Sequence, residues 1–248
     1  MPLTVHQFAC LSDNYGFLVR DEATGKTATI DTPDADAILA ELARLGWTLD
    51  LILNTHWHPD HAGGNAAIKA ATGATIVGPA EVTRIAPLDR EVGDGDVVAL
   101  GETRFTVIDT GGHTLGHIAY HDAADAIAFV GDTLFALGCG RLFEGTAEQM
   151  WASLERLTAL PDTTTVYCAH EYTASNARFA LSVDGDAALK ARAEQVFALR
   201  ERGEPTVPTS IGLEKATNPF LRAPLLRPGL SPAMAFAEIR AAKDGFKG

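Results

Sequence analysis

Cysteine is scarce in this chain of 248 residues: Cys10, Cys139 and Cys168 are its three cysteines, and none form a C-x-x-C pair. Such a sparse, odd-numbered set argues against a disulfide framework and favours a reducing compartment. Apolar runs of the roughly 18 residues that a membrane span needs are missing. The first residues lack a basic segment followed by a long apolar one, so no signal peptide is expected. We therefore expect a cytoplasmic protein.

Basic residues are also in short supply. The chain has 20 Lys and Arg against 32 Asp and Glu, a net charge of −12, which disfavours nucleic acids and anionic membranes as partners. The charge is uneven, because residues 1–172 carry a net −15 and residues 173–248 a net +3. This change of sign suggests two parts with different roles, although chance variation of a solvated surface is the simpler alternative.

Hydrophobic residues make up 46% of the chain, which is ordinary for a globular protein. Up to residue 172, short apolar runs alternate with turn residues, and we expect helices at 34–45, 60–71 and 146–160 among many short strands. Beyond residue 172 the pattern predicts helices at 174–183, 187–202 and 232–244, separated by a proline-rich segment. The expected fold class is α+β, with domains at 1–172 and 173–248 and a small helical C-terminal domain.

The densest chemistry follows the apolar run Leu49–Leu53. His56, His58, Asp60 and His61 lie within six residues as H-x-H-x-D-H. Imidazole nitrogens and carboxylate oxygens are the ligands of Zn, Fe and Mn. A single histidine in a polar loop is most simply an incidental one, whereas three beside an aspartate after a buried strand predict a metal site.

Three further candidates each follow an expected strand: His113, Asp132 and His170. Seven nitrogen and oxygen ligands are too many for one tetrahedral ion. Shared between two ions, with a carboxylate bridging, they leave room for an activated water. The sequence therefore predicts a site for two divalent metal ions. Zinc is the expected metal, with iron or manganese as alternatives.

This ligand order resembles that of the metallo-β-lactamase superfamily. Within it the chain is similar to the glyoxalase II family, the hydroxyacylglutathione hydrolases, in the segments 132–135, 138–146, 170–173, 218–222 and 239–244. The resemblance implies an αββα sandwich followed by a helical domain. It also implies an enzyme that hydrolyses S-D-lactoylglutathione, a glutathione thioester, to D-lactate and glutathione, the second step of methylglyoxal detoxification. Separately from the resemblance, we expect a monomer.

The resemblance also implies roles for individual residues. His56, His58 and His113 would hold one ion, Asp60, His61 and His170 the other, and Asp132 would bridge them. Asp60 and Asp132 would be catalytic, with Asp60 steering the proton of the attacking water. Glutathione would contact Arg141, Phe143, Tyr172, Arg240 and Lys243. Some family members have tyrosine where this chain has Phe143, which offers no phenolic hydrogen bond.

Several other residues invite less specific interpretations. Asp31 follows an expected strand and is a candidate to hold a ligand histidine in one tautomer. His117 is expected to orient the site or pack rather than bind metal. Cys168 is expected to be buried, and Cys139, between two glycines, to be more exposed.

Two functions of other classes remain open at this stage. One is a sulfur dioxygenase of the same superfamily that uses a single iron, and this would leave the Arg240 and Lys243 tail unexplained. The other is a metal-binding module without catalysis, which would take up metal and leave thioesters intact. A lactonase or β-lactamase would also leave the basic tail unexplained.

Overall fold

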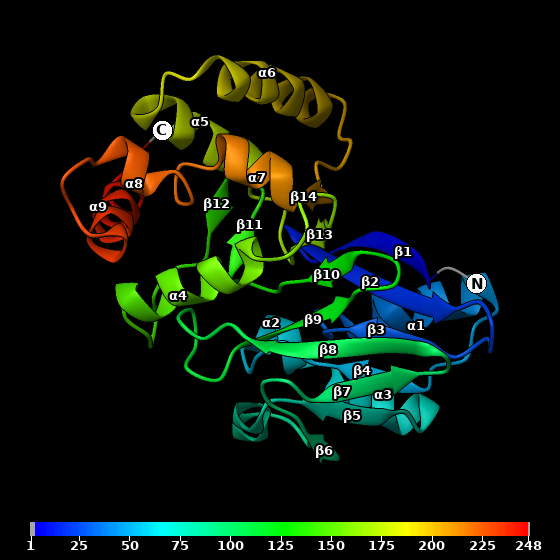
Figure 1. Ribbon diagram of the computed structural model, residues 1–248. Coiled ribbons are helices and arrows are strands. Elements are labelled where there is room, and N and C mark those ends of the chain that lie inside the picture. The colour runs from blue at the N-terminus through cyan, green and yellow to red at the C-terminus, as the bar shows by residue number, and fades with distance from the viewer. Residues whose placement is uncertain (1–2, 248) are drawn as a thin grey trace. The chain divides into compact units, whose positions relative to one another are not determined.

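A computed structural model describes residues 3–247 of the chain. The chain divides into two compact units, the first made of residues 1–109 and 116–131, the second of residues 110–115 and 132–248. These units differ from the division at residue 172 expected from charge and pattern, because the segments 110–115 and 132–172 group with the C-terminal residues. Figure 1 labels the elements of both units.

The first unit contains a six-stranded sheet whose strands follow one another in chain order. The first three strands pair antiparallel, and the last three join in parallel. Its strands are β1 (Leu3–Cys10), β2 (Asn14–Asp21), β3 (Thr27–Ile30), β4 (Leu51–Leu53), β5 (Thr75–Gly78) and β6 (Arg90–Glu91). Beyond the carboxyl ends of the parallel strands β3 and β4 lie the loops that carry Asp31 and the H-x-H-x-D-H segment.

Helices α1 (Ala35–Leu45) and α3 (Asn65–Thr72) pack on this sheet. Ile38 of α1 and Ile68 of α3 join strand residues such as Ile52 in one buried cluster. Burying each such side chain stabilises the fold by about 1.5–3 kcal/mol. Helix α1 begins and ends as expected, because the Asp34 carboxylate accepts from the backbone N–H of Ala37 and Gly46 closes the helix in the left-handed conformation.

The single helix expected over residues 60–71 is wrong. The structure instead has α2 (Pro59–Ala62) and α3, separated by Gly63 and Gly64. A Cβ at Gly64 would lie 2.7 Å from the carbonyl oxygen of Thr32, and the Gly64 N–H donates to that same oxygen. The close approach requires glycine and turns the chain between the two helices. It leaves Asp60 and His61 on a short helix of their own.

Four antiparallel strands form a second layer in the first unit. They are β7 (Val97–Leu100), β8 (Thr103–Asp109), β9 (Ile118–Asp122) and β10 (Ile127–Phe129), following the 3-10 helix Ala80–Arg84. They pair in the order β10-β9-β8-β7, and β7 and β8 form a hairpin that turns at Gly101. Phe129 packs edge-on against Phe17 of β2 with ring centroids 5.7 Å apart, and the Tyr120 hydroxyl donates to the Asn54 carbonyl at 2.9 Å. The core of the unit therefore lies between the two layers.

The second unit is mainly helical (Figure 1). Its strands are β11 (Leu134–Phe135), β12 (Gly138–Cys139), β13 (Thr165–Tyr167) and β14 (Thr209–Ser210). Its helices are α4 (Ala147–Thr158), α5 (Thr173–Val183), α6 (Ala187–Glu201), α7 (Ile211–Thr217), α8 (Ala223–Leu226) and α9 (Pro232–Asp244). The helices expected at 146–160, 174–183, 187–202 and 232–244 are confirmed within a few residues, and the proline-rich segment between the last two adds β14, α7 and α8. Within residues 3–247, no helix combines the length and apolar content that crossing a membrane takes.

The short hairpin β11–β12 is held by polar side chains from the helices of its own unit. Glu214 of α7 accepts from the backbone N–H of Leu137 at 2.9 Å. Asn218 donates to the carbonyl of Gly138 at 2.9 Å, and Asn176 of α5 donates to that of Ala136 at 3.1 Å. Helices α5 and α7 therefore fix the path of the segment that follows Asp132.

Candidate metal centre and pocket

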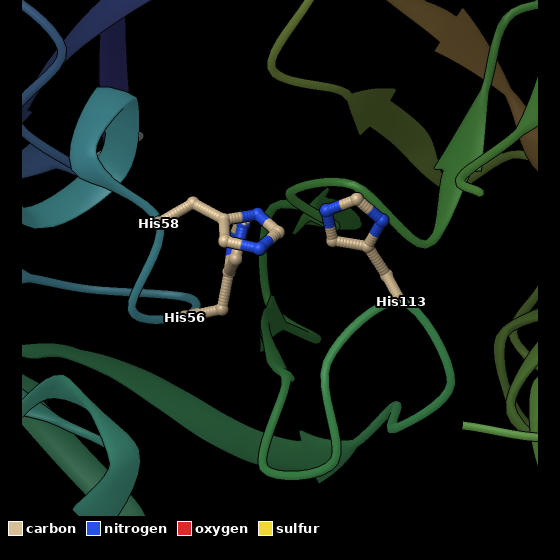
Figure 2. Close-up of side chains that lie close together, drawn as sticks. All are labelled: His56, His58 and His113. Carbon is tan, nitrogen blue, oxygen red and sulfur yellow. Dashed lines mark hydrogen bonds between the residues drawn. The ribbon is translucent and has the colours of Figure 1, made fainter. Parts of the chain in front are cut away.

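The H-x-H-x-D-H segment of the first unit begins three residues after the end of β4 and runs into α2. His56 is fully buried and His61 is 1% exposed. The His56 Nε2 and His58 Nδ1 atoms lie 3.0 Å apart, and Figure 2 shows the two rings together. The Asp60 Oδ2 and His61 Nε2 atoms lie 3.6 Å apart. The first unit thus presents two pairs of metal-binding atoms.

Asp31 holds one of these histidines, as expected from the sequence. The carboxylate, 4% exposed, accepts from His61 Nδ1 at 2.8 Å. The proton on Nδ1 leaves the Nε2 lone pair as the atom that can bind a metal. Asn14, at the start of β2, similarly donates to Asp60 Oδ2 at 3.1 Å. Sequence analysis missed Asn14, because a polar residue beginning a strand has no distinctive spacing.

The second unit brings together His113, Asp132 and His170. The His113 Nε2 lies 3.3 Å from Asp132 Oδ2, and the His170 Nε2 lies 3.4 Å from Asp132 Oδ1. All three residues are less than 7% exposed. Figure 2 places His113 on its loop after β8, where its Nδ1 donates to the Arg141 carbonyl at 2.9 Å. Asp132 therefore faces one imidazole with each of its oxygens.

These separations suit divalent metal ions. Two atoms bound about 2.0–2.1 Å from one tetrahedral ion lie about 3.3–3.4 Å apart. The four pairs, two in each unit, measure 3.0, 3.6, 3.3 and 3.4 Å. Imidazole and carboxylate donors are those that zinc, iron and manganese share. The residues present therefore fit a metal centre.

His170 is packed between aromatic rings. The Tyr172 ring lies parallel to the imidazole, with centroids 4.7 Å apart and an interplanar angle of 3°. Phe135 meets both rings edge-on, at 5.9 and 5.4 Å. This packing fixes the plane of the imidazole.

His117, expected to pack or orient rather than bind metal, is fully buried, with its ring centroid 4.8 Å from that of His56.

A pocket of about 500 Å³ opens within the second unit. His113 and Asp132 line it together with the five residues expected to contact substrate, which are Arg141, Phe143, Tyr172, Arg240 and Lys243. The remaining lining residues, which sequence analysis missed, are Phe135, Cys139, Ser175, Asn176, Asp244 and Phe246. Most of these lie on the β11–β12 hairpin or on α5 and α9, whose approach to one another has no signature in local sequence.

The pocket has a basic end. The Lys243 Nζ, half-buried, donates to both the carbonyl and the hydroxyl of Ser175 at 3.2 Å. Burial, followed by the nearby charges of Arg240 and Arg141, lowers the pKa of Lys243 from 10.5 to about 8. Arg141 is exposed. An anionic group placed here would relieve the repulsion among these cations.

Arg240 differs from its two basic neighbours, because it is 5% exposed. Its guanidinium donates to the Cys139 carbonyl at 3.0 Å and to Asp244 at 2.8 Å, and it lies 4.9 Å over the Phe220 ring. Both terminal nitrogens of the guanidinium therefore donate within the protein, while the buried Nε has no hydrogen-bond partner among residues 3–247. Arg240 shapes the pocket wall at Cys139 while contributing positive charge behind it.

The cysteines are poor nucleophiles. Cys139 was expected to be more exposed than Cys168, and the difference is small: it is 5% exposed against 0%, because the hairpin turns it inward against Arg240. Burial raises the pKa of the Cys139 thiol to about 11 and that of Cys168 to about 12. Neither thiolate forms at neutral pH, so the chemistry of this pocket points to the metal ligands.

Two family models match the chain in succession. The model described as the metallo-beta-lactamase superfamily matches residues 17–170, and that of the hydroxyacylglutathione hydrolase C-terminus matches residues 171–246. A curated hydroxyacylglutathione hydrolase from Maricaulis maris is 58% identical over 253 residues, which cover 98% of this chain and 99% of the relative.

Solved structures show the same similarity. ETHE1 from Myxococcus xanthus superimposes with a TM-score of 0.72 and 31% identity, covering 96% of this chain and 90% of that one. The protein TTHA1623, solved in a di-iron-bound form, gives a TM-score of 0.64 and 25% identity, covering 88% of this chain and 100% of that one.

Proposed function

The chain belongs to the hydroxyacylglutathione hydrolases of the metallo-β-lactamase superfamily, and we propose that it hydrolyses S-D-lactoylglutathione to D-lactate and glutathione in the glyoxalase pathway. The expected fold class, an α+β metallo-β-lactamase fold with a helical C-terminal part, is confirmed. One observation of the structure carries the proposal furthest. His113 and Asp132 share a pocket with a basic end built by Arg141 and Lys243. A metal centre beside an anion site suits an anionic thioester.

The chain binds divalent metal ions through its histidine and aspartate donors. We assign His56, His58 and His113 to one ion. We assign Asp60, His61 and His170 to a second, and Asp132 to both. The pairing within each unit supports this assignment, because Asp132 Oδ2 faces His113 while Oδ1 faces His170. The protein TTHA1623 in its di-iron form supports two ions, and zinc is the metal we propose here, with iron and manganese as alternatives.

Such ions, when bound, lower the pKa of coordinated water and polarise a carbonyl oxygen. The residues around them orient the ligands and move protons. Asp60 keeps one carboxylate oxygen toward Asn14 and His61, and we assign it to accept the proton of the attacking water. Asp31 and the Arg141 carbonyl hold His61 and His113 in the tautomer that binds metal.

Substrate binding is assigned to the far end of the pocket. Lys243 and Arg141 would bind the glutathione carboxylates, with Arg240 adding charge from behind the wall. Tyr172 would meet the peptide through its phenol, and Phe143, 62% exposed, would cover the pocket mouth by packing. The leaving group is a thiolate whose parent thiol has a pKa of about 8.5, so it departs without a separate general acid.

Further parts of the proposal concern organisation. We propose that residues 1–172 form the catalytic domain and residues 173–248 a substrate-binding domain, in keeping with the family models that meet at residues 170 and 171. We propose a monomer in the cytoplasm without nucleic-acid or membrane partners, in keeping with the net charge of −12.

A single assay tests this function. Purified enzyme is mixed with S-D-lactoylglutathione, and loss of the thioester absorbance is followed alongside D-lactate. Glutathione persulfide is offered in parallel with oxygen uptake as the readout, because a sulfur dioxygenase is the main alternative. Thioester loss with stoichiometric D-lactate supports the proposal. Oxygen uptake without thioester loss would support the dioxygenase, and metal uptake with neither activity would support a binding module.

A further inference from the structure

Beyond the ligands themselves, the first unit contains a buried chain of hydrogen bonds that joins two of them. Asp31 follows β3 in the left-handed conformation, with φ 57°, which only a minority of non-glycine residues adopt. Its Oδ1 accepts from the Thr55 N–H at 2.7 Å, and its Oδ2 accepts from the Thr55 hydroxyl at 2.8 Å. The same Oδ2 accepts from His61 Nδ1 at 2.8 Å. Thr55 Oγ1 in turn lies 3.0 Å from His56 Nδ1.

The direction of each proton in this chain follows from the donors available. An ionised carboxylate can only accept hydrogen bonds, so the Thr55 hydroxyl donates its one proton to Asp31. The Thr55 oxygen can then only accept from His56 Nδ1, which therefore carries a proton. This places the lone pair of His56 on Nε2, the atom that lies 3.0 Å from His58 Nδ1. Thr55 thus sets the tautomer of His56, as Asp31 sets that of His61.

We propose that Thr55 is a positioning residue, through which the single carboxylate of Asp31 controls both His56 and His61. This inference rests on the proposed function, in which these two histidines hold different ions. One buried carboxylate then governs a ligand of each ion, one directly and one through the hydroxyl. Asp31, Thr55, His56 and His61 are all less than 5% exposed, so water does not replace the missing partner when the hydroxyl is removed.

Valine in place of Thr55 keeps the shape of the side chain and removes the hydroxyl. His56 Nδ1 then loses its acceptor, and the ring gains access to the tautomer that carries its proton on Nε2. Loss of such a partner costs about 10–100-fold in metal affinity. Thr55→Val should therefore lower the affinity for one of the two metal ions by this factor and leave the affinity for the other unchanged. Asp31→Asn should weaken both, and Thr55→Ser should restore the wild-type affinity.

Thr29→Val is the matched control. Thr29 is also fully buried, and its hydroxyl donates to the backbone carbonyl of Asp31 at 2.9 Å, away from the imidazoles. The Thr29→Val variant therefore loses a buried hydroxyl beside Asp31 and leaves the hydrogen bonds that join Asp31, Thr55 and the two histidines in place. Circular dichroism and thermal unfolding of the metal-free variants confirm that each one folds.

The measurement is stepwise zinc binding to metal-free protein, in competition with a chromogenic chelator. The proposal expects two zinc-binding steps in wild type. One of these steps should be weakened in Thr55→Val and both should be weakened in Asp31→Asn. Thr29→Val and Thr55→Ser should bind zinc in both steps as tightly as wild type does. Two wild-type steps with Thr55→Val indistinguishable from Thr29→Val would overturn the role of Thr55 alone. A wild type that binds a single ion would overturn both this inference and the two-ion assignment on which it rests, while the thioester assay decides separately whether the protein is a hydrolase.

Discussion

Lys243 offers the sharpest prediction about substrate binding. Its ammonium lies in the pocket at 3.2 Å from both acceptors of Ser175 and on the far side of the pocket from the reacting carbonyl in the proposed binding mode. Lys243→Met keeps the length of the side chain and removes the charge. Loss of a hydrogen bond to a charged group costs about 1.5–3 kcal/mol, so KM should rise about 10- to 100-fold. The contact is the same in ground and transition states, so kcat should stay within about twofold.

The pH dependence of the wild type gives a second readout of the same group. Because the pKa of Lys243 in the free enzyme is about 8, the lysine is charged at pH 7 and neutral in about ten of eleven molecules at pH 9. If the charged form binds substrate, KM should rise about tenfold between pH 7 and pH 9. Bound anion favours the charged form, so the effect should appear in KM and kcat/KM rather than in kcat.

Three variants complete the experiment. Lys243→Met should have a high KM that no longer changes between pH 7 and 9, and Lys243→Arg should have a low KM at both, since arginine stays charged. Lys190→Met, which removes an exposed lysine of α6 outside the pocket, is the control for net charge. Steady-state kinetics, corrected for spontaneous thioester hydrolysis, measure all four proteins. Equal KM in wild type and Lys243→Met at pH 7 would refute the reasoning.

Four further substitutions test other parts of the account. Asp132→Asn should lower kcat by more than the roughly 10–100-fold expected for a residue that only orients a ligand. His117→Asn should lower kcat by no more than that range. Equal losses of kcat in the two variants, with full metal content in both, would contradict the ligand assignment. Phe143→Tyr should lower KM about 2- to 10-fold, since a hydrogen bond contributes about 0.5–1.5 kcal/mol, and an unchanged KM would place the ring away from substrate. Glu214→Gln should destabilise the fold by about 3–5 kcal/mol in urea titrations, because it leaves the buried Arg192 uncompensated; a change below about 1 kcal/mol would contradict a paired charge there.

Local sequence predicts the parts of this protein whose causes are local. The α1 helix is bounded by a capping aspartate and a left-handed glycine, both visible in sequence. The role of Asp31 could be anticipated because an acidic residue after a strand lies at the edge where the metal ligands gather. By contrast, the break at Gly64 depends on the carbonyl of Thr32, which is distant in sequence. A helix-period pattern cannot reveal such a contact.

The geometry of the pocket also depends on contacts between segments that are distant in sequence, and local sequence does not reveal them. The basic residues of α9 were found through family resemblance and a charge imbalance, and both indicate a binding region without its geometry. The burial of Arg240 and of Cys139 follows from the β11–β12 hairpin, which is held by Glu214 and Asn218 across about 80 residues of sequence. Helix α7, which supplies these side chains, lies in a segment whose prolines favour a loop interpretation.

The central claim is that two metal ions and thioester hydrolysis belong to one site. The most direct test is titration of metal-free enzyme with zinc, with bound metal and S-D-lactoylglutathione turnover measured on the same samples. The account predicts that activity reaches its maximum at two equivalents of zinc per chain. Full activity at one equivalent, with no further gain on adding the second, would contradict it.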